Sequence, residues 1–196
     1  MDIRPVVLEG VHVRLEPLSL DHLPALIEIG IEPGLWRWTT QTVRTPQEMT
    51  EYVHGALAEQ AAGHALPFAT VEKASGRVAG STRFAAIAPF HRRVEIGWTW
   101  LAPRWQRTAL NTEAKYLMLA HAFDQWGCLR VEFKADVLNT RSRQALLRIG
   151  AKEEGILRSH MITATGRIRD TVYFSIIAPE WPAVRAALEA RLQPRG

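Results

Sequence analysis

Hydrophobic and polar residues alternate along several short stretches of the chain, which is the pattern of strands that bury one face. Residues 12–15, 67–72, 77–86 and 94–101 follow this pattern. Turn-forming residues at 73–76 join the second stretch to the third. The first half of the chain therefore predicts an antiparallel sheet, with the last three strands arranged as a meander.

Other stretches carry the spacing of a helix with one apolar face. Thr45 and Glu48 form a capping box around Pro46, so a helix is predicted from there to about residue 62. Residues 20–29 predict an earlier helix, with Ser19 as a candidate cap. These helices lie between predicted strands along the chain, and their apolar faces can pack against the sheet.

From residue 112 onward, helices and strands take turns. The pattern predicts helices at 112–126 and 140–149, strands at 131–135, 152–161 and 169–177, a turn at Thr165-Gly166 and a last helix that begins near Pro182. The whole chain, 1–196, is expected to form a single α/β domain. Its sheet would have mixed strand directions and helices on both faces.

Composition narrows the function classes only modestly. The net charge is +4 and the basic residues are scattered, which favours anionic ligands weakly and offers no nucleic-acid motif. The single Cys128 excludes an internal disulfide and a cysteine-rich zinc site, and the histidines lack metal-ligand spacing, so no metal is expected. No apolar run approaches the ~18–20 residues that span a membrane, and the N-terminus does not resemble a signal peptide. We therefore expect a cytoplasmic protein.

Residues 94–112 join a strand, a short basic loop and the start of a helix. The free backbone N–H groups and the positive dipole at a helix N-terminus bind phosphate. Loop 106–111, with Arg104 and Arg107 nearby, is therefore a candidate pyrophosphate site, although it contains no glycine. The alternative is a plain strand-to-helix turn in which Asn111 caps the helix.

A second strand runs into a helix at residues 136–143. Asn139 is placed to cap that helix, and Ser142 would lie in its first turn. If two neighbouring parallel strands both end in this way, the sheet splays and a ligand crevice forms at their carboxyl ends. Capping alone is the competing explanation for Asn139.

Four ordered motifs resemble the GNAT (GCN5-related N-acetyltransferase) superfamily, in particular the RimJ/RimL-type enzymes that acetylate ribosomal-protein N-termini. The first two are the loop 106–111 (family pattern Gln/Arg-x-x-Gly-x-Gly/Ala) and the Asn-x-x-Ser motif at 139–142. The other two are the segments 149–155 and 166–175. The resemblance as a whole spans about residues 8 to 182. Both family glycines of the loop are replaced. The resemblance implies a GNAT fold: one mixed, mostly antiparallel sheet of about seven strands, splayed at its centre, with helices on both faces.

The resemblance also implies acetyl-CoA as the donor, with CoA as product, and a primary amine as the acceptor. It places the pyrophosphate on the amides of 107–112 and the pantetheine arm in the splay beside 98–102. A bulge near Trp98–Trp100 would free a backbone N–H that polarises the thioester carbonyl. The implied donor-binding residues are Trp98, Trp100, Leu101, Ala102, Gln106, Arg107, Thr108, Ala109, Leu110, Asn111, Thr112, Asn139 and Ser142.

Catalysis needs help for the departing thiolate and a route for the amine proton. The resemblance makes Ser142 the candidate for the first task. Glu95 and His160 are candidate bases, with a water relay as the third option; Met161 stands where some relatives carry a glutamate. An α-amine, with a pKa of about 7.7–8.0 against about 10.4 for lysine, demands less of a base.

Trp36 and Trp38 are expected to wall the acceptor site, or else to be core or dimer contacts. The predicted function is an acetyl-CoA-dependent N-acetyltransferase, in which the α-amine of a protein or peptide attacks directly in a ternary complex. The alternatives are acetylation of a small-molecule amine (an antibiotic, a polyamine or an amino acid) and a non-catalytic acyl-CoA sensor. An RNA- or ribosome-binding module rests on the net charge alone, and a homodimer is a family-level expectation.

Overall fold

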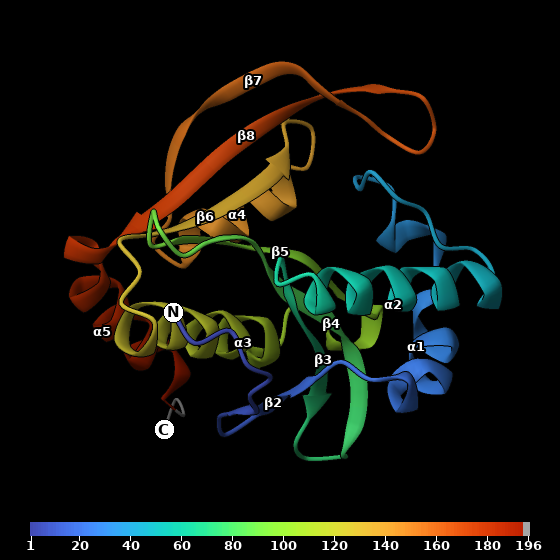
Figure 1. The fold of residues 1–196 in the computed structure, drawn as a ribbon, viewed down its shortest axis with the longest axis horizontal. Coiled ribbons are helices and arrows are strands. Elements are labelled where there is room, and N and C mark those ends of the chain that lie inside the picture. Colours follow the sequence, from blue (N-terminus) through green and yellow to red (C-terminus); the bar gives the residue numbers. More distant parts are fainter. Residues whose placement is uncertain (194–196) are drawn as a thin grey trace.

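The computed structural model describes residues 1–193. Within that part of the chain, eight strands form one sheet in the order β1-β2-β3-β4-β5-β6-β8-β7 (Figure 1), and only the pair β5–β6 is parallel. The predicted mixed, mostly antiparallel sheet is confirmed, with one strand more than expected because two-residue β1 is too short to leave a pattern. The strands are β1 (Leu8–Glu9), β2 (Val13–Pro17), β3 (Leu66–Glu72), β4 (Arg77–Ala88), β5 (Arg93–Leu101), β6 (Arg130–Asp136), β7 (Lys152–Ile162) and β8 (Ile168–Ile177).

The helices also follow the predicted order. They are α1 (Leu23–Gly30), α2 (Pro46–Ala61), α3 (Ala109–Ala120), α4 (Thr140–Arg148) and α5 (Trp181–Leu192). Helix α3 begins three residues earlier than predicted, and a π-helix, His121–Gln125, follows it directly. No helix among residues 1–193 is both long and apolar enough to cross a bilayer.

Helix α2 begins as its sequence predicts. The backbone N–H of Glu48 donates to Thr45 Oγ1 at 3.1 Å, and the backbone N–H of Thr45 donates to Glu48 Oε2 at 3.2 Å. Pro46 occupies the first helical position, where its missing N–H costs nothing. This reciprocal cap fixes where α2 starts.

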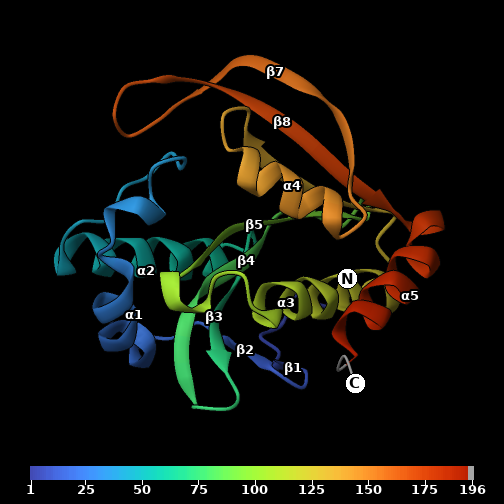
Figure 2. The same ribbon diagram turned by 180° about the vertical axis from the view of Figure 1, so that it is seen from behind.

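Hydrophobic clusters pack on both faces of the sheet. Phe68 and Ala69 of β3 belong to different clusters because successive side chains of a strand point to opposite faces. On the first face, Phe68 packs with Phe84 and with Met118 of α3; on the second, Ala69 packs with residues of α1 and α2 such as Met49. Helices α3 and α5 therefore lie on one side and α1 and α2 on the other (Figure 2).

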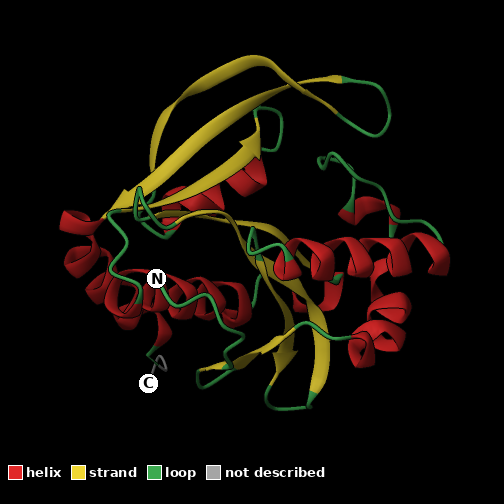
Figure 3. Ribbon diagram, viewed as in Figure 1, coloured by secondary structure: helices red, strands yellow, loops and turns green. Residues whose placement is uncertain are grey.

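The parallel pair β5–β6 opens part-way along its length. Its register runs only from Arg93 opposite Arg130 to Glu95 opposite Glu132, whereas β5 continues to Leu101 and β6 to Asp136. Figure 3 shows the two halves of the sheet fanning apart from this short pairing. The predicted splay at the centre of the sheet is therefore present.

Strand β5 carries a bulge beside this opening. Trp100 pairs with Ser81 and Gly97 pairs with Arg83, so β5 has one residue more than β4 over this interval. Trp98 lies inside the bulge with φ of +48°. This confirms the predicted irregularity near Trp98–Trp100 and leaves backbone groups there outside the β4–β5 ladder.

Candidate active site

Helix α3 starts directly after the basic loop, and Thr108 caps it. Thr108 Oγ1 accepts a hydrogen bond from the backbone N–H of Leu110 at 3.3 Å and donates to the carbonyl of Trp105 at 2.8 Å. Asn111 lies within the first turn together with Ala109, Leu110 and Thr112. The interpretation in which Asn111 caps the helix is therefore wrong, because the Thr108 hydroxyl is available three residues earlier.

The loop holds its left-handed residue at Arg107, whose φ is +64°. The two positions where the family pattern has glycine, Ala109 and Asn111, lie in the helix and need no left-handed backbone. Within residues 1–193, no hydrogen bond uses the backbone N–H of Arg107, Thr108 or Ala109. These three donors meet at the positive end of the α3 dipole, which favours an anion.

Gln106 links this loop to the neighbouring helix. Its Nε2 donates to the carbonyl of Leu101 at 2.7 Å, and its Oε1 accepts from Arg141 Nη2 at 2.5 Å. Its backbone N–H donates to Pro103 at 3.2 Å. Gln106 therefore ties the end of β5 to the first turn of α4 and offers no free amide to a phosphate.

Helix α4 starts on the other side of the opening between β5 and β6. Asn139 Oδ1 accepts a hydrogen bond from the backbone N–H of Ser142 at 3.1 Å, so Asn139 caps the helix as its position predicts. The Ser142 side chain is half-buried in the first turn. The Arg141–Gln106 contact shows that the starts of α3 and α4 lie next to each other.

The predicted pantetheine-binding residues of β5 differ in what they offer. Trp100 is buried, with its ring centroid 5.6 Å from that of Trp36, and so serves the core. The Leu101 carbonyl already accepts from Gln106, and the Ala102 N–H donates to Ala79 at 2.9 Å. Trp98 is the exception, with 43% of its surface exposed.

Glu95 is buried and ion-paired. Its Oε2 lies 2.7 Å from Lys134 Nζ on β6. Burial opposes the charge of Lys134, but the hydrogen bond and charge of Glu95 outweigh it and raise the pKa of Lys134 above its ordinary value. Glu95 is therefore not a loose surface residue but a buried carboxylate paired with the half-buried Lys134.

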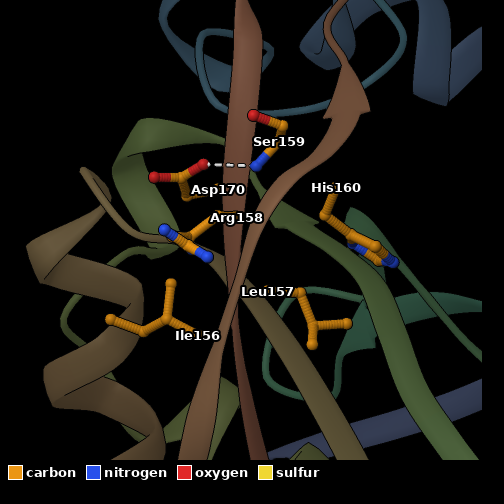
Figure 4. Close-up of a pocket in the computed structure, with 6 residues that line it drawn as sticks. All are labelled: Ile156, Leu157, Arg158, Ser159, His160 and Asp170. Atoms are coloured by element: carbon orange, nitrogen blue, oxygen red, sulfur yellow. Dashed lines mark hydrogen bonds between the residues drawn. The ribbon is translucent and has the colours of Figure 1, made fainter.

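His160 has different surroundings. It lies on β7, beside an open hollow of about 900 Å³ (Figure 4). The hollow is lined by Ile156, Leu157, Arg158, Ser159 and His160 of β7 and by Asp170 of β8. Asp170 Oδ1 accepts from the backbone N–H of Ser159 at 2.6 Å, on the opposite side of the strand from the His160 ring. The exposed His160 ring packs edge-on against Tyr173, with centroids 5.8 Å apart. No acidic side chain orients this imidazole among the described residues.

The two early tryptophans separate into a core residue and a surface residue. Trp36 is buried, donates from Nε1 to the Gly30 carbonyl at 2.8 Å and packs edge-on against Tyr52. Trp36 is thus a core residue, which was the alternative to a place in the wall of the acceptor site. Trp38 is half-buried, and its carbonyl accepts from Arg169 Nη1 at 3.3 Å.

A second cleft, of about 670 Å³, lies between α2 and the strands β4 and β5. Sequence reasoning missed it, although Glu48, Tyr52, Gly55 and Glu59 recur at helical spacing and so share one face of α2. Among residues 1–193, no group of three or more His, Cys, Asp or Glu side chains could hold a metal ion. The residues that line this cleft include Glu48, Glu51, Tyr52, Glu59, Arg83 and Trp98.

A buried lysine on α3 also escaped the sequence reasoning. Lys115 is 5% exposed, and its Nζ donates to Thr99 Oγ1 at 2.6 Å and to Thr82 Oγ1 at 3.3 Å. Burial lowers the pKa of Lys115 to about 7. The only sequence signal was a lysine within an otherwise apolar helical face.

The chain is similar in sequence to a known protein family. The model of the acetyltransferase (GNAT) domain matches residues 12–152. The chain belongs to the GNAT acetyltransferase family. The sequence-based assignment to N-acetyltransferases is thus confirmed at the level of the family.

Individual relatives agree with this assignment. YdaF of Bacillus subtilis, provisionally named a ribosomal N-acetyltransferase, is 31% identical over 106 residues, which are 54% of this chain and 57% of YdaF. A GCN5-related N-acetyltransferase from Brucella melitensis superposes with a TM-score of 0.91 at 35% identity, covering 97% of this chain and 87% of that one. RimJ of Mycobacterium smegmatis, solved with CoA-disulfide, gives 0.80 at 26% identity, covering 95% and 92%. The matched part of the chain spans little more than half the length of the curated relatives.

Proposed function

We propose that this GNAT protein is an acetyl-CoA-dependent N-acetyltransferase whose acceptor is the α-amine of a protein or peptide. One observation carries the proposal: the opening between β5 and β6, the bulge at Trp98 and the uncommitted N–H groups at the start of α3 all occur at one end of β5. The CoA adduct named for RimJ supports CoA as the ligand type, and the name of YdaF supports a protein acceptor.

The loop residues fit a pyrophosphate. Arg107, Thr108 and Ala109 present backbone donors without acceptors, and the exposed Arg107 adds a guanidinium. The replaced glycines do not argue against this fit, because Ala109 and Asn111 take ordinary helical conformations. When bound, acetyl-CoA would supply an acetyl group activated as a thioester.

The remaining residues would handle the proton and the charge. A backbone N–H freed by the bulge at Trp98 would polarise the thioester carbonyl. Glu95, buried and paired with Lys134, is the proposed acceptor of the amine proton, with His160 and a water relay as rivals. Ser142 at the start of α4 would donate its hydroxyl proton toward the departing thiolate.

The test is thiol release from acetyl-CoA in the presence of N-terminal peptides, lysine peptides, polyamines, amino acids and aminoglycosides, with CoA affinity measured in parallel. We expect release with N-terminal peptides. Release with none of the acceptors, despite measurable CoA binding, would contradict the proposal and favour an acyl-CoA sensor.

The second candidate function is acetylation of a small polycationic amine. Glu48, Glu51 and Glu59 along α2 line the 670 Å³ cleft, and such carboxylates attract polycations. Faster release with a polyamine or an aminoglycoside than with any peptide would favour this candidate.

A further inference from the structure

Arg83 is a buried cation beside the bulge. It lies on β4, is 6% exposed and pairs in register with Gly97 of β5. Its guanidinium carbon lies 5.1 Å from the ring centroid of Tyr52 and 5.1 Å from that of Trp98. These cation–π contacts provide no acceptor oxygen for its N–H groups, which therefore remain available to a ligand.

Within residues 1–193, Arg83 has neither an acidic partner nor a hydrogen-bond acceptor for its side chain. Its Nε and the Tyr52 hydroxyl are both buried and both unpaired. Arginine cannot escape the cost of burial by losing its proton, and buried charges in proteins are otherwise paired. Two orphaned polar groups that line one cleft indicate a ligand with acceptor oxygens.

The outer part of the cleft carries the opposite charge. Glu48 accepts from the backbone of Thr45 at 3.2 Å, Glu51 from Gln47 at 2.9 Å, and Glu59 lies 3.6 Å from His64. Each of these carboxylates therefore has a partner, unlike Arg83. A free phosphate would meet three negative charges in this cleft, so a carboxylate that is carried by a larger ligand fits Arg83 better.

The distance across β5 between Arg83 and the β5–β6 opening determines how far the ligand carboxylate must lie from the reacting amine. Arg83 is on one side of β5, and the opening that would receive the acetyl group is on the other. Neighbouring strands are about 4.8 Å apart, so carboxylate and reacting amine would be roughly 5–10 Å apart. The α-carboxylate of a free amino acid lies too close to its own amine to span this separation. An acidic side chain at the first or second position of a peptide can span it.

We propose that the cleft between α2 and β4–β5 is a carboxylate subsite and that the acceptor is a peptide N-terminus with an acidic residue in its first two positions. Arg83 binds that carboxylate through its N–H edge, and the Tyr52 hydroxyl donates a second hydrogen bond. The inference rests on the proposed function and specifies its substrate class.

The test compares C-terminally amidated hexapeptides that differ only at position two, as aspartate, asparagine or lysine, with one more peptide that carries its aspartate at position five. For the wild type we expect kcat/KM to be about 10- to 100-fold higher with aspartate at position two than with asparagine, mainly through KM. Aspartate at position five should give no advantage. A wild-type ratio near one for aspartate over asparagine would overturn the proposal.

Variants assign the preference to Arg83. Arg83→Gln should bring the aspartate-to-asparagine ratio of kcat/KM to about one, because the carboxylate loses its charged partner. Arg77→Gln, an exposed arginine on the same strand paired with Glu28 at 3.4 Å, is the matched control and should keep the preference. A preference that survives in Arg83→Gln would also overturn the proposal. If that variant does not fold, the peptide series measured with the wild type and with Arg83→Lys tests the proposal instead.

Failure of the proposed function has a different signature. In that case no peptide is acetylated although acetyl-CoA binds. Calorimetry with the same peptides then tests the subsite itself. Tighter binding of the aspartate peptide that is lost in Arg83→Gln supports the subsite, and equal binding of all peptides overturns it.

Discussion

The amine of Lys115 donates a 2.6 Å hydrogen bond to the hydroxyl of Thr99, which lies in the bulged part of β5. Burial is the cause of its lowered pKa, about 7, because the two threonine hydroxyls it contacts carry no charge. Helix α3 thus supports the bulge from one face of the sheet, while Arg83 and Trp98 form the cleft wall on the other.

We predict that the wild-type protein gains stability as pH rises from 7 to 9. The pKa of Lys115 is lower in the folded state than in the unfolded state, so the unfolded state binds more protons above pH 7, and folding becomes more favourable by about 2 kcal/mol over this range. Lys115→Met removes the titrating group and should lack this gain. Urea unfolding of both proteins across this pH range measures it, and parallel curves would contradict the prediction.

Glu113 should be the strongest local anchor of the N-terminal strands. Its buried carboxylate accepts from the backbone N–H groups of Val11, His12 and Val13 at 2.8, 2.6 and 2.7 Å. Glu113→Gln should therefore lower the free energy of unfolding by about 2–4 kcal/mol. Exposed Glu28→Gln should change it by less than about 0.5 kcal/mol.

A double-mutant cycle checks that contact. A Cβ at Gly10 would lie 2.5 Å from Glu113 Cδ, so Gly10→Ala should destabilise the wild type by displacing the carboxylate. The same change should cost much less in Glu113→Ala. Equal costs in both backgrounds, measured by urea unfolding, would show that the carboxylate is not held as described.

The order of elements was predictable because it depends on local patterns. Alternation marked the long strands, and Thr45, Pro46 and Glu48 fixed the start of α2. The start of α3 was misplaced because Asn111 and Thr108 are both good caps, and only the chain's path after Trp105 selects Thr108. Strand β1 has only two residues, which is too few to show an alternation of hydrophobic and polar positions.

The site was predictable only where the backbone defines it. The splay, the bulge and the two adjacent helix starts lie where strands end, and sequence motifs mark those strand ends. Burial of Arg83 does not, because α2 covers that face of β4 from a distant part of the sequence. In the same way, loop sequence alone could not tell that Trp36 enters the core while Trp38 stays near the surface.

Ala109→Pro and Ala109→Gly separate the contribution of one backbone donor from the effect of the missing glycine. Proline is tolerated at the first helical position and removes one N–H, and the extended φ of −104° at Thr108 permits it. Ala109→Pro should weaken CoA binding about tenfold or more, whereas Ala109→Gly should stay within about threefold. Equal affinities by calorimetry would place the pyrophosphate elsewhere.

Glu95 and His160 differ as bases in a measurable way. If Glu95 takes the amine proton, Glu95→Gln should lower kcat/KM about 100-fold at pH 7. The loss should shrink as pH rises above about 8, because the α-amine then deprotonates by itself. His160→Ala should stay within about twofold, since the ring is exposed and has no acidic partner among the described residues.

The controls for Glu95 separate chemistry from packing. The double variant Glu95→Gln with Lys134→Met removes both members of the ion pair and should recover stability lost by Glu95→Gln alone. Activity should not recover with it. Full activity of Glu95→Gln at pH 7 would leave the water relay as the route for the proton.

Ser142 and Asn139 lie at the same helix start, but their substitution should have different effects: one on activity, the other on stability. The Asn139 side chain caps α4 through the backbone N–H of Ser142, so Asn139→Ala should cost about 1 kcal/mol of stability. The Ser142 hydroxyl takes no part in that cap, so Ser142→Ala should leave stability within about 0.5 kcal/mol. It should nevertheless lower kcat about tenfold or more with CoA affinity intact, because the thiolate loses its proton donor. A kcat within about twofold of wild type would remove Ser142 from the reaction and leave it a residue of the helix start only.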